Sequence, residues 1–79
     1  MWYIYFLELS NKQIYVGSTN DLKRRIYQHN NKEVTSTAKL TPVKLKSYIA
    51  VENEEISRKA EIYFKSGSGK AIAKKRFLK

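Results

Sequence analysis

A small set of side chains in this sequence has the types and spacing that phosphodiester cleavage would require. The set consists of Tyr3, Tyr5, Tyr15, Arg25, His29 and Glu61. Such cleavage needs a proton acceptor for the attacking water and a cation that stabilises the pentacovalent phosphate. It also needs an acid or metal at the leaving group and a basic surface that holds the backbone. Arg25 cannot lose its proton, so its place in this chemistry is that of an electrophilic stabiliser.

The tyrosines fall on a predicted β-hairpin. Residues 2–9 are rich in β-branched and aromatic side chains on both faces, which is typical of a strand that is covered on both sides. Three polar turn residues follow, and residues 13–17 have the composition of a second strand. In this hairpin we expect Tyr5 and Tyr15 near opposite positions on one face. Gly17 closes the second strand, where a missing side chain lets another group approach.

A helix after the hairpin is predicted to carry the arginine and the histidine. The segment 18–21, Ser-Thr-Asn-Asp, is a helix start in which Ser or Thr would cap and Asp21 would suit the positive helix end. We expect the helix to end at Asn30. At 100° per residue one stripe holds Leu22, Arg25, Ile26 and His29. Charged groups avoid burial unless they are paired, so Arg25 and His29 on this stripe are candidates for a site.

The remaining chain predicts a polar loop, a strand and two helices. Residues 31–41 read as the loop and 43–51 as a third strand. Asn53 can cap the next helix, and Ser66-Gly67 would end it. The apolar stripe of this helix would be Ile56, Ala60, Tyr63 and Phe64, with Glu61 at the edge of the stripe. Residues 70–78 would form a last basic helix. The order β-β-α-β-α-α predicts an α+β fold with a small, mostly antiparallel sheet flanked by helices.

The charge distribution points to a polyanionic partner. The 79 residues carry 16 Lys+Arg and 7 Asp+Glu, a formal net charge of +9, and this length predicts a single domain over residues 1–79. Residues 21–49 and 65–79 are basic, while 50–64 are acidic. Nucleic acid is the expected partner, and the candidate contacts are Lys23, Arg24, Lys39, Lys65, Lys70 and Lys74. The apolar run at the N-terminus is too short for a membrane span or signal peptide, so we expect a soluble cytoplasmic protein with no membrane partner.

The residue types and their spacing argue against several other kinds of site. The segment 65–71 lacks the glycine six residues before Lys70 and has Ala71 in place of the Ser or Thr of a phosphate-binding loop, so it predicts only a turn between helices. The chain has no Cys and one His, which excludes a zinc cluster and cysteine chemistry. Nothing puts Ser18 on the strained elbow of a Ser-His-Asp triad.

The ordered set of motifs resembles the GIY-YIG endonuclease superfamily. The resemblance rests on Tyr3-Ile4-Tyr5, on Tyr15-Val16-Gly17 ten residues later, and on residues 18–25, 29–30, 35–37, 42–45, 60–61 and 64–70. It covers nearly the whole chain and is strongest to the small single-domain branch that groups with the UvrC nuclease domain. Tyr3 stands where the family name has glycine.

The resemblance implies a fold, an activity and residue roles. The fold would be a three-stranded antiparallel sheet flanked by helices, and the activity would be cleavage of DNA with one divalent metal, Mg²⁺ or Mn²⁺, in DNA repair or recombination. By position, Tyr5 or Tyr15 would assist the general base or orient the water. Arg25 would hold the scissile phosphate, His29 would lie near the site, and Glu61 would bind the metal.

Two further functions remain open from the sequence. The first is a nucleic-acid-binding module that keeps the fold without cleaving, and the second is a basic protein that docks on ribonucleoprotein. Characterised relatives of this kind usually borrow a DNA-binding domain, so the resemblance also implies a protein partner that supplies substrate specificity.

Overall fold

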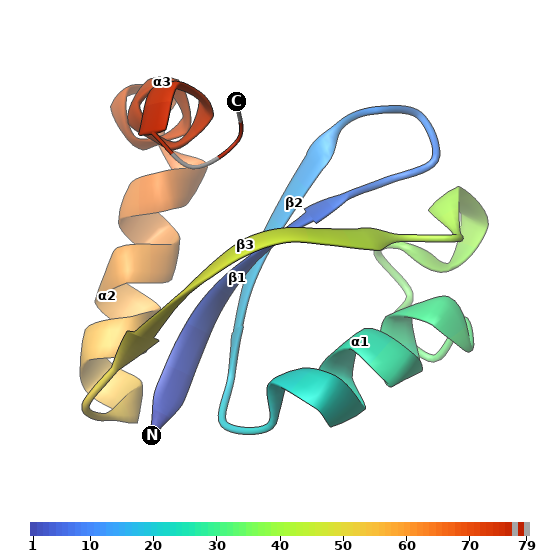
Figure 1. The fold of residues 1–79 in the computed structure, drawn as a ribbon, viewed down its shortest axis with the longest axis horizontal. Helices are drawn as coiled ribbons and strands as arrows, with labels where there is room; N and C mark the ends of the chain where they lie inside the picture. The colour runs from blue at the N-terminus through green and yellow to red at the C-terminus, as the bar shows by residue number, and fades with distance from the viewer. Residues whose placement is uncertain (77, 79) are drawn as a thin grey trace.

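The fold is a three-stranded antiparallel sheet with helices on both faces (Figure 1). A computed structural model describes residues 1–76 and Leu78. Its elements are β1 (Trp2–Glu8), β2 (Ile14–Thr19), α1 (Leu22–Asn30), the short 3₁₀ helix η1 (Ala38–Leu40), β3 (Lys44–Val51), α2 (Glu54–Lys65) and α3 (Gly67–Arg76). The predicted α+β class and the element order β-β-α-β-α-α are confirmed.

The central strand β1 explains why both faces of residues 2–9 are apolar. The strand order is β2-β1-β3, so β1 is flanked by a strand on each side. Ile4 and Phe6 pack with Phe64 of α2 and Ala73 of α3. On the other face Tyr5 and Leu7 belong to a second apolar cluster, which also contains Leu9 and Val43 and packs against residues of α1. Two thin cores therefore share one strand, and β2 is left as an edge strand between the helical layers (Figure 1).

The hairpin register differs from the expectation for the tyrosines. Tyr5 lies opposite Gly17, and Tyr15 lies opposite Leu7, so Tyr5 and Tyr15 are diagonal neighbours on one face rather than opposite residues. A side chain added at Gly17 would overlap the phenol ring of Tyr5, with its Cβ 2.5 Å from Cζ. The group that approaches the glycine is thus the tyrosine across the strand pair.

The start of α1 also differs in its cap. Strand β2 continues through Ser18 and Thr19, so neither residue caps the helix. Asp21 is the N-cap, and its side chain accepts a hydrogen bond from the Arg24 backbone N–H at 3.2 Å. Thr19 instead accepts from the Asp21 backbone N–H at 3.1 Å and fixes the turn that precedes the cap. The predicted end of the helix at Asn30 is confirmed.

The buried face of α2 is rotated from the predicted apolar stripe. Ile56 and Tyr63 are 42% and 44% exposed, whereas Ser57 is fully buried. Ser57 can be buried because its hydroxyl donates to the Glu54 carbonyl at 2.7 Å. Asn53 caps the helix as expected, by accepting from the Ile56 backbone N–H at 2.9 Å.

The segment after α2 is helical rather than a turn. Helix α2 ends at Lys65, Ser66 is extended, and α3 begins at Gly67, so the predicted stop is in the right place but does not use a left-handed glycine. A Cβ at Gly69 would overlap the backbone of Tyr63, so the glycine lets α3 pack closely against the end of α2. The helix predicted over 70–78 starts earlier and ends at Arg76; its penultimate position, 77, lies outside the described residues.

Candidate active site at the edge strand

Tyr5 is the centre of a buried polar cluster. Its side chain is 1% exposed, and its hydroxyl lies 3.0 Å from His29 Nε2. Arg25 Nε donates to the same hydroxyl at 3.3 Å. His29, which is fully buried, has its other ring nitrogen, Nδ1, 2.7 Å from the Thr37 hydroxyl. The strand, α1 and the loop before η1 each supply a member of this chain of contacts.

The donors and acceptors of the cluster fix the positions of its protons. Arg25 can only donate, so the Tyr5 oxygen accepts a hydrogen bond from its Nε–H. The Thr37 hydroxyl donates to the Val34 carbonyl, so it accepts from His29 Nδ1–H. In this tautomer Nε2 of the neutral imidazole accepts from the Tyr5 hydroxyl. The hydrogen bonds therefore run in one direction from Arg25 through Tyr5 and His29 to Thr37, with a neutral imidazole in the middle.

Helix α1 places Arg25 and His29 on one face because they are four residues apart. The predicted stripe is confirmed: Leu22 and Ile26 pack against the apolar cluster of this face, and His29 points inward. Arg25 is half-buried and also donates from Nη1 to Gln28 Oε1 at 3.2 Å. Two contacts therefore hold its guanidinium, and within residues 1–76 and 78 its Nη2 has no hydrogen-bond partner.

Tyr15 joins this cluster through its ring. Its ring centroid lies 5.2 Å from that of His29 and 6.4 Å from that of Tyr5. Lys65 Nζ of α2 lies 5.8 Å from the Tyr15 ring centroid. Tyr15 is half-buried on the edge strand, so it stands between the buried cluster and the helix on the other side.

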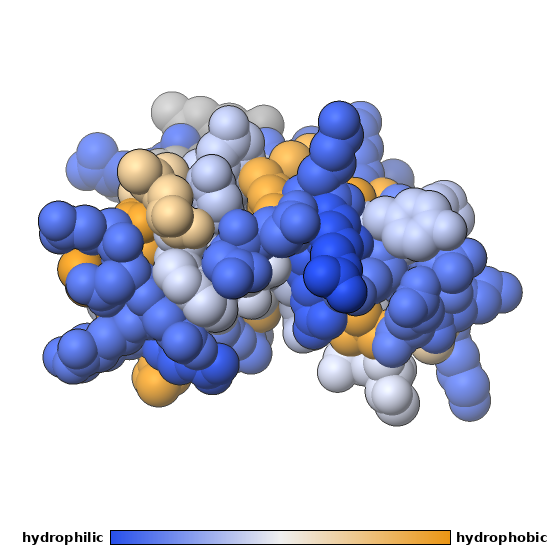
Figure 2. All heavy atoms as spheres, turned by 90° about the horizontal axis from the view of Figure 1, so that it is seen from below, coloured by the Kyte–Doolittle hydropathy of each residue, from blue (hydrophilic) through white to orange (hydrophobic). Residues whose placement is uncertain are grey.

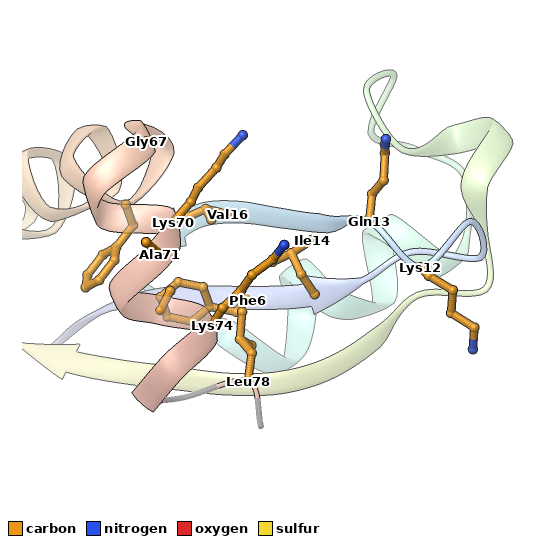
Figure 3. Close-up of a pocket in the computed structure, with 12 residues that line it drawn as sticks. Phe6, Lys12, Gln13, Ile14, Val16, Gly67, Lys70, Ala71, Lys74 and Leu78 are labelled. Carbon is orange, nitrogen blue, oxygen red and sulfur yellow. The ribbon is translucent and has the colours of Figure 1, made fainter.

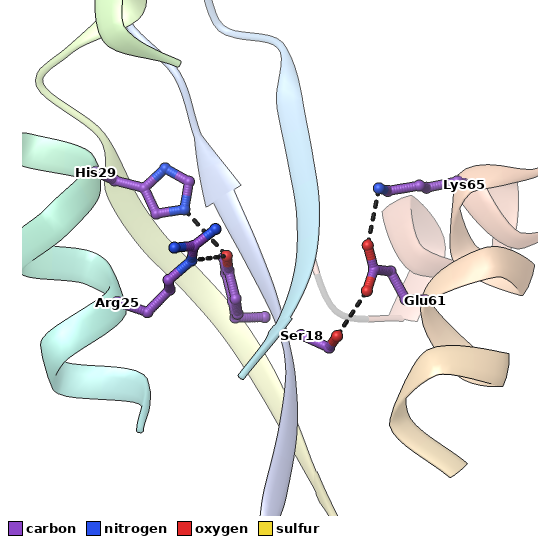
Figure 4. Close-up of polar contacts among 6 residues, drawn as sticks. Ser18, Arg25, His29, Glu61 and Lys65 are labelled. Carbon is purple, nitrogen blue, oxygen red and sulfur yellow. Dashed lines mark hydrogen bonds and ion pairs between the residues drawn. The ribbon is translucent and has the colours of Figure 1, made fainter. Parts of the chain in front are cut away.

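Glu61 belongs to a second cluster on α2. Its Oε1 accepts from the Ser18 hydroxyl at 2.6 Å, and its Oε2 is paired with Lys65 Nζ at 2.8 Å. Figure 4 shows Arg25 and His29 on one side of β2 and Glu61 and Lys65 on the other. The structure thus brings Tyr5, Tyr15, Arg25 and His29 together and holds Glu61 across the edge strand from them.

A cleft of about 240 Å³ lies at the end of β2 and is lined by residues from both clusters. Its lining includes Ser18, which binds Glu61, and Arg25, which binds Tyr5. The negative charge of Glu61 is also among the influences that raise the pKa of Tyr5, after burial and the neighbouring Tyr15. Each cluster therefore contributes at least one residue to the lining of the same cleft.

Burial makes Tyr5 and His29 neutral at pH 7. Burial raises the pKa of Tyr5 above its usual value, although the hydrogen bond from Arg25 opposes that shift. Burial, reinforced by the charge of Arg25, lowers the pKa of His29 to about 4. Burial alone would raise the pKa of Glu61, but the hydrogen bonds from Lys65 and Ser18 outweigh it and hold that pKa below its ordinary value. Glu61 is therefore ionised.

The buried His29 predicts a loss of stability in mild acid. Unfolded histidine takes up a proton below pH 6.5, whereas folded His29 resists protonation down to about pH 4, so stability rises with pH through this window. Between pH 7 and pH 5 the free energy of unfolding should fall by about 2 kcal/mol. Urea unfolding at both pH values measures the change, and His29→Gln should remove it. A wild-type stability that is flat over this interval would contradict a neutral buried His29.

The donor set at Glu61 fits a hard divalent cation. Mg²⁺ is commonly held by one or two carboxylates with water in its remaining positions. Glu61 is ionised and its side chain is 21% exposed, so water can complete a coordination shell once Lys65 moves off Oε2. Among the described residues no group of three His, Cys, Asp or Glu side chains could hold a metal ion, so water would have to complete most of the coordination shell of any ion bound at Glu61.

The predicted DNA contacts are all exposed but do not form one patch. Lys23 and Arg24 lie on α1, and Lys39 lies in η1. Lys65 is tied to Glu61. Lys70 and Lys74 lie on α3, where they line a separate hollow of about 670 Å³ over Phe6 (Figure 3). The basic blocks therefore reach both sides of the sheet.

Sequence reasoning missed four residues of the site. Thr37 and Gln28 anchor His29 and Arg25, Ser18 binds Glu61, and Arg58 lines the cleft. Two of the four had been noticed in the sequence for other reasons: Ser18 as a candidate helix cap, and Thr37 as part of the motif at residues 35–37. A buried threonine is found from its contacts, since its residue type alone does not distinguish it from a loop threonine.

Comparison with known proteins agrees with this architecture. The family model described as the GIY-YIG catalytic domain matches residues 1–76. The chain belongs to the GIY-YIG family, whose domain is a nuclease fold.

Its relatives are small proteins of the UPF0213 group. One from Streptococcus pyogenes serotype M5 is 39% identical over 64 residues, which is 80% of this chain and 70% of the relative. One from Pediococcus acidilactici is 35% identical over 72 residues, which is 87% of this chain and 74% of the relative. The solution NMR structure of the UPF0213 protein of Bacillus halodurans matches with a TM-score of 0.56 at 30% identity, over 91% of this chain and 81% of that one.

The described helices do not include one that is long and apolar enough to cross a membrane.

Proposed function

We propose that this protein is a divalent-metal-dependent endonuclease that hydrolyses phosphodiester bonds in DNA. Membership of the GIY-YIG family supports the nuclease class. The observation that carries the proposal is the arrangement around one cleft: Arg25, held by Tyr5, lines it, and so does Ser18, which donates a hydrogen bond to the ionised Glu61. We propose repair or recombination in the cytoplasm as its setting, with a partner protein that helps select the DNA.

Arg25 is the residue that holds the scissile phosphate. A guanidinium binds two phosphate oxygens at once and keeps its charge throughout the reaction. Its Nε is fixed by Tyr5 and its Nη1 by Gln28, so the rest of the fork is held in place before substrate arrives. A fixed donor stabilises the charge of the transition state without having to reorganise.

Tyr5, His29 and Thr37 act as positioning residues for Arg25. Tyr5 is too deeply buried to take a proton from water directly, and its own proton is directed at His29. Its raised pKa also disfavours the phenolate that a base requires. The sequence left the roles of the two tyrosines open, and the burial of Tyr5 supports a role in holding the arginine.

Tyr15 is the tyrosine that orients the attacking water or accepts its proton. It is the half-buried member of the pair, and it stands at the edge strand between the two clusters. Lys65 Nζ of α2 lies 5.8 Å from its ring centroid, so Tyr15 faces the Glu61 cluster as well as Tyr5 and His29.

Glu61 would hold the metal ion, with Ser18 beside it. When bound, the ion would supply positive charge at the phosphate and leaving oxygen. The protein's own part is to keep Glu61 ionised, which Lys65 and Ser18 do through their hydrogen bonds. Lys65 is then displaced from Oε2 and remains available for the DNA backbone.

Nicking of supercoiled DNA tests the proposal. We expect nicked product with Mg²⁺ or Mn²⁺ and none when EDTA removes the metal. Supercoiled, branched and single-stranded substrates should be compared, because a cut on any of them satisfies the hypothesis. No metal-dependent cutting on all three would reject it.

One observation favours a second candidate, a nucleic-acid-binding module without cleavage. Glu61 is already neutralised by Lys65 at 2.8 Å, so the carboxylate has a partner that competes with a metal ion. In that case the protein would bind DNA with a steep dependence on salt and would be indifferent to EDTA.

A further inference from the structure

The cleft at the end of β2 collects three arginines from two helices. Arg24 and Arg25 come from α1, and Arg58 comes from α2 on the other face of the sheet. The remaining lining is Trp2, Ser18, Thr19, Asn20, Asp21 and Gln28. Asp21 is the one acid of this lining, so the walls of the cleft keep an excess of positive charge. Figure 2 looks onto this end of the molecule, where hydrophilic side chains predominate.

Arg58 is held in a way that leaves part of its guanidinium for a ligand. Its Nε and Nη2 both contact one oxygen of Glu54, at 2.8 Å and 2.7 Å. A guanidinium has five N–H donors, so this pairing uses two and leaves the Nη1 side for another acceptor. The side chain is 64% exposed, which lets it reach a ligand in the cleft. Glu54 therefore orients Arg58 without using up its donors.

The guanidinium donors of this cleft indicate what kind of ligand it binds. Planar guanidinium forks bind phosphate oxygens in pairs, and three of them lining a single cleft match an extended anion better than a point charge. Arg25 is already assigned to the phosphate to be cut, so the other two arginines lie where a neighbouring phosphate of the same strand would pass.

We propose that Arg58, with Arg24, forms a subsite for the phosphate next to the scissile one. The nucleic-acid strand then crosses the end of β2 from α1 to α2, and Arg58 holds it on the α2 side. This inference rests on the proposed nuclease function, since it takes Arg25 as the site of the cut. It assigns Arg58 a direct role in substrate binding, in addition to its ion pair with Glu54.

Trp2 offers a direct report on this cleft. It lines the opening and is the one tryptophan in the sequence. Its fluorescence can be excited apart from that of the tyrosines, so a change on adding DNA reports events at the subsite itself. EDTA in the buffer prevents cutting, and the measurement therefore needs no activity.

The test is a titration with duplex DNA, monitored through Trp2, for wild type, Arg58→Gln and Lys59→Gln. Lys59 is the next residue on α2, has the same charge and pairs with Glu55, but does not line the cleft. Arg58→Gln should weaken binding about threefold to tenfold and reduce the slope of affinity against salt by about 0.9. Lys59→Gln should bind within about twofold of wild type, because exposed pairs contribute little.

The outcomes separate this inference from the function on which it rests. Equal losses of affinity in both variants, or no loss in Arg58→Gln, would overturn the subsite while leaving metal-dependent cutting untouched. A specific loss in Arg58→Gln in a protein that never cuts DNA would support phosphate binding in the cleft and reject the nuclease. Circular dichroism of Arg58→Gln checks that α2 is intact, and Arg58→Lys should keep most of the salt slope with weaker binding, because lysine retains the charge but loses the fork.

Discussion

Replacement of Glu61 by glutamine is expected to reduce metal-dependent cutting by about a thousandfold or more. The amide has nearly the shape of the carboxylate but lacks the charge that a divalent cation requires. Its pairing with Lys65 is also lost, which frees a positive charge beside the cleft. DNA binding without metal should therefore be equal to or tighter than in the wild type, and the variant separates cutting from binding.

The matched control for this change is Glu55→Gln. Glu55 lies on the same helix, and its ion pair with Lys59 has the same i,i+4 spacing. Both members of this ion pair are highly exposed, so the loss of the Glu55 charge should leave the cutting rate within about twofold of wild type. Nicking rates at saturating Mg²⁺ and at saturating Mn²⁺ give the comparison. Normal cutting by Glu61→Gln would exclude Glu61 as the metal ligand.

Replacement of Arg25 by lysine is expected to slow cutting by about a hundred- to a thousandfold. Lysine keeps the charge, but it cannot bind two phosphate oxygens while remaining bound to Tyr5 and Gln28. The loss should fall on the rate at saturating DNA more than on affinity, because the stabilised charge develops in the transition state.

A control for Arg25 is Arg76→Lys on α3, which is exposed and lies outside the cleft. It should cut like the wild type. Single-turnover rates at several DNA concentrations distinguish the two effects. A variant Arg25→Lys that loses only affinity would mean that this arginine holds DNA without assisting the reaction.

Much of the fold could be predicted because local patterns and tertiary packing agree. Residues 2–9 are apolar on both faces, and the strand they form is indeed covered on both. The end of α1 at Asn30 and both limits of α2, at Asn53 and residue 66, follow from local sequence signals. The rotation of α2 could not be predicted, because Ser57 is buried only by satisfying its hydroxyl within its own helix.

The candidate site was predictable as a set of residues but not as an arrangement. Helical spacing predicted that Arg25 and His29 share one face of α1, and in the structure both side chains contact the Tyr5 hydroxyl. The two-cluster layout depends on the hairpin register, which differs by two positions from the expected one. A shift of two residues preserves the face but changes the partner, so periodicity alone cannot detect it.

The contact between Tyr5 and Gly17 links the two tyrosine-containing motifs of the family, because Tyr5 belongs to the first motif and Gly17 to the second. The tyrosine of the first motif occupies the space that the glycine of the second leaves empty. Any side chain at position 17 would push the phenol off the strand, and the arginine that rests on its oxygen would move with it. Gly17 has no functional group, yet the space it leaves sets the position of the Tyr5 ring and, through the Tyr5 hydroxyl, that of the Arg25 guanidinium.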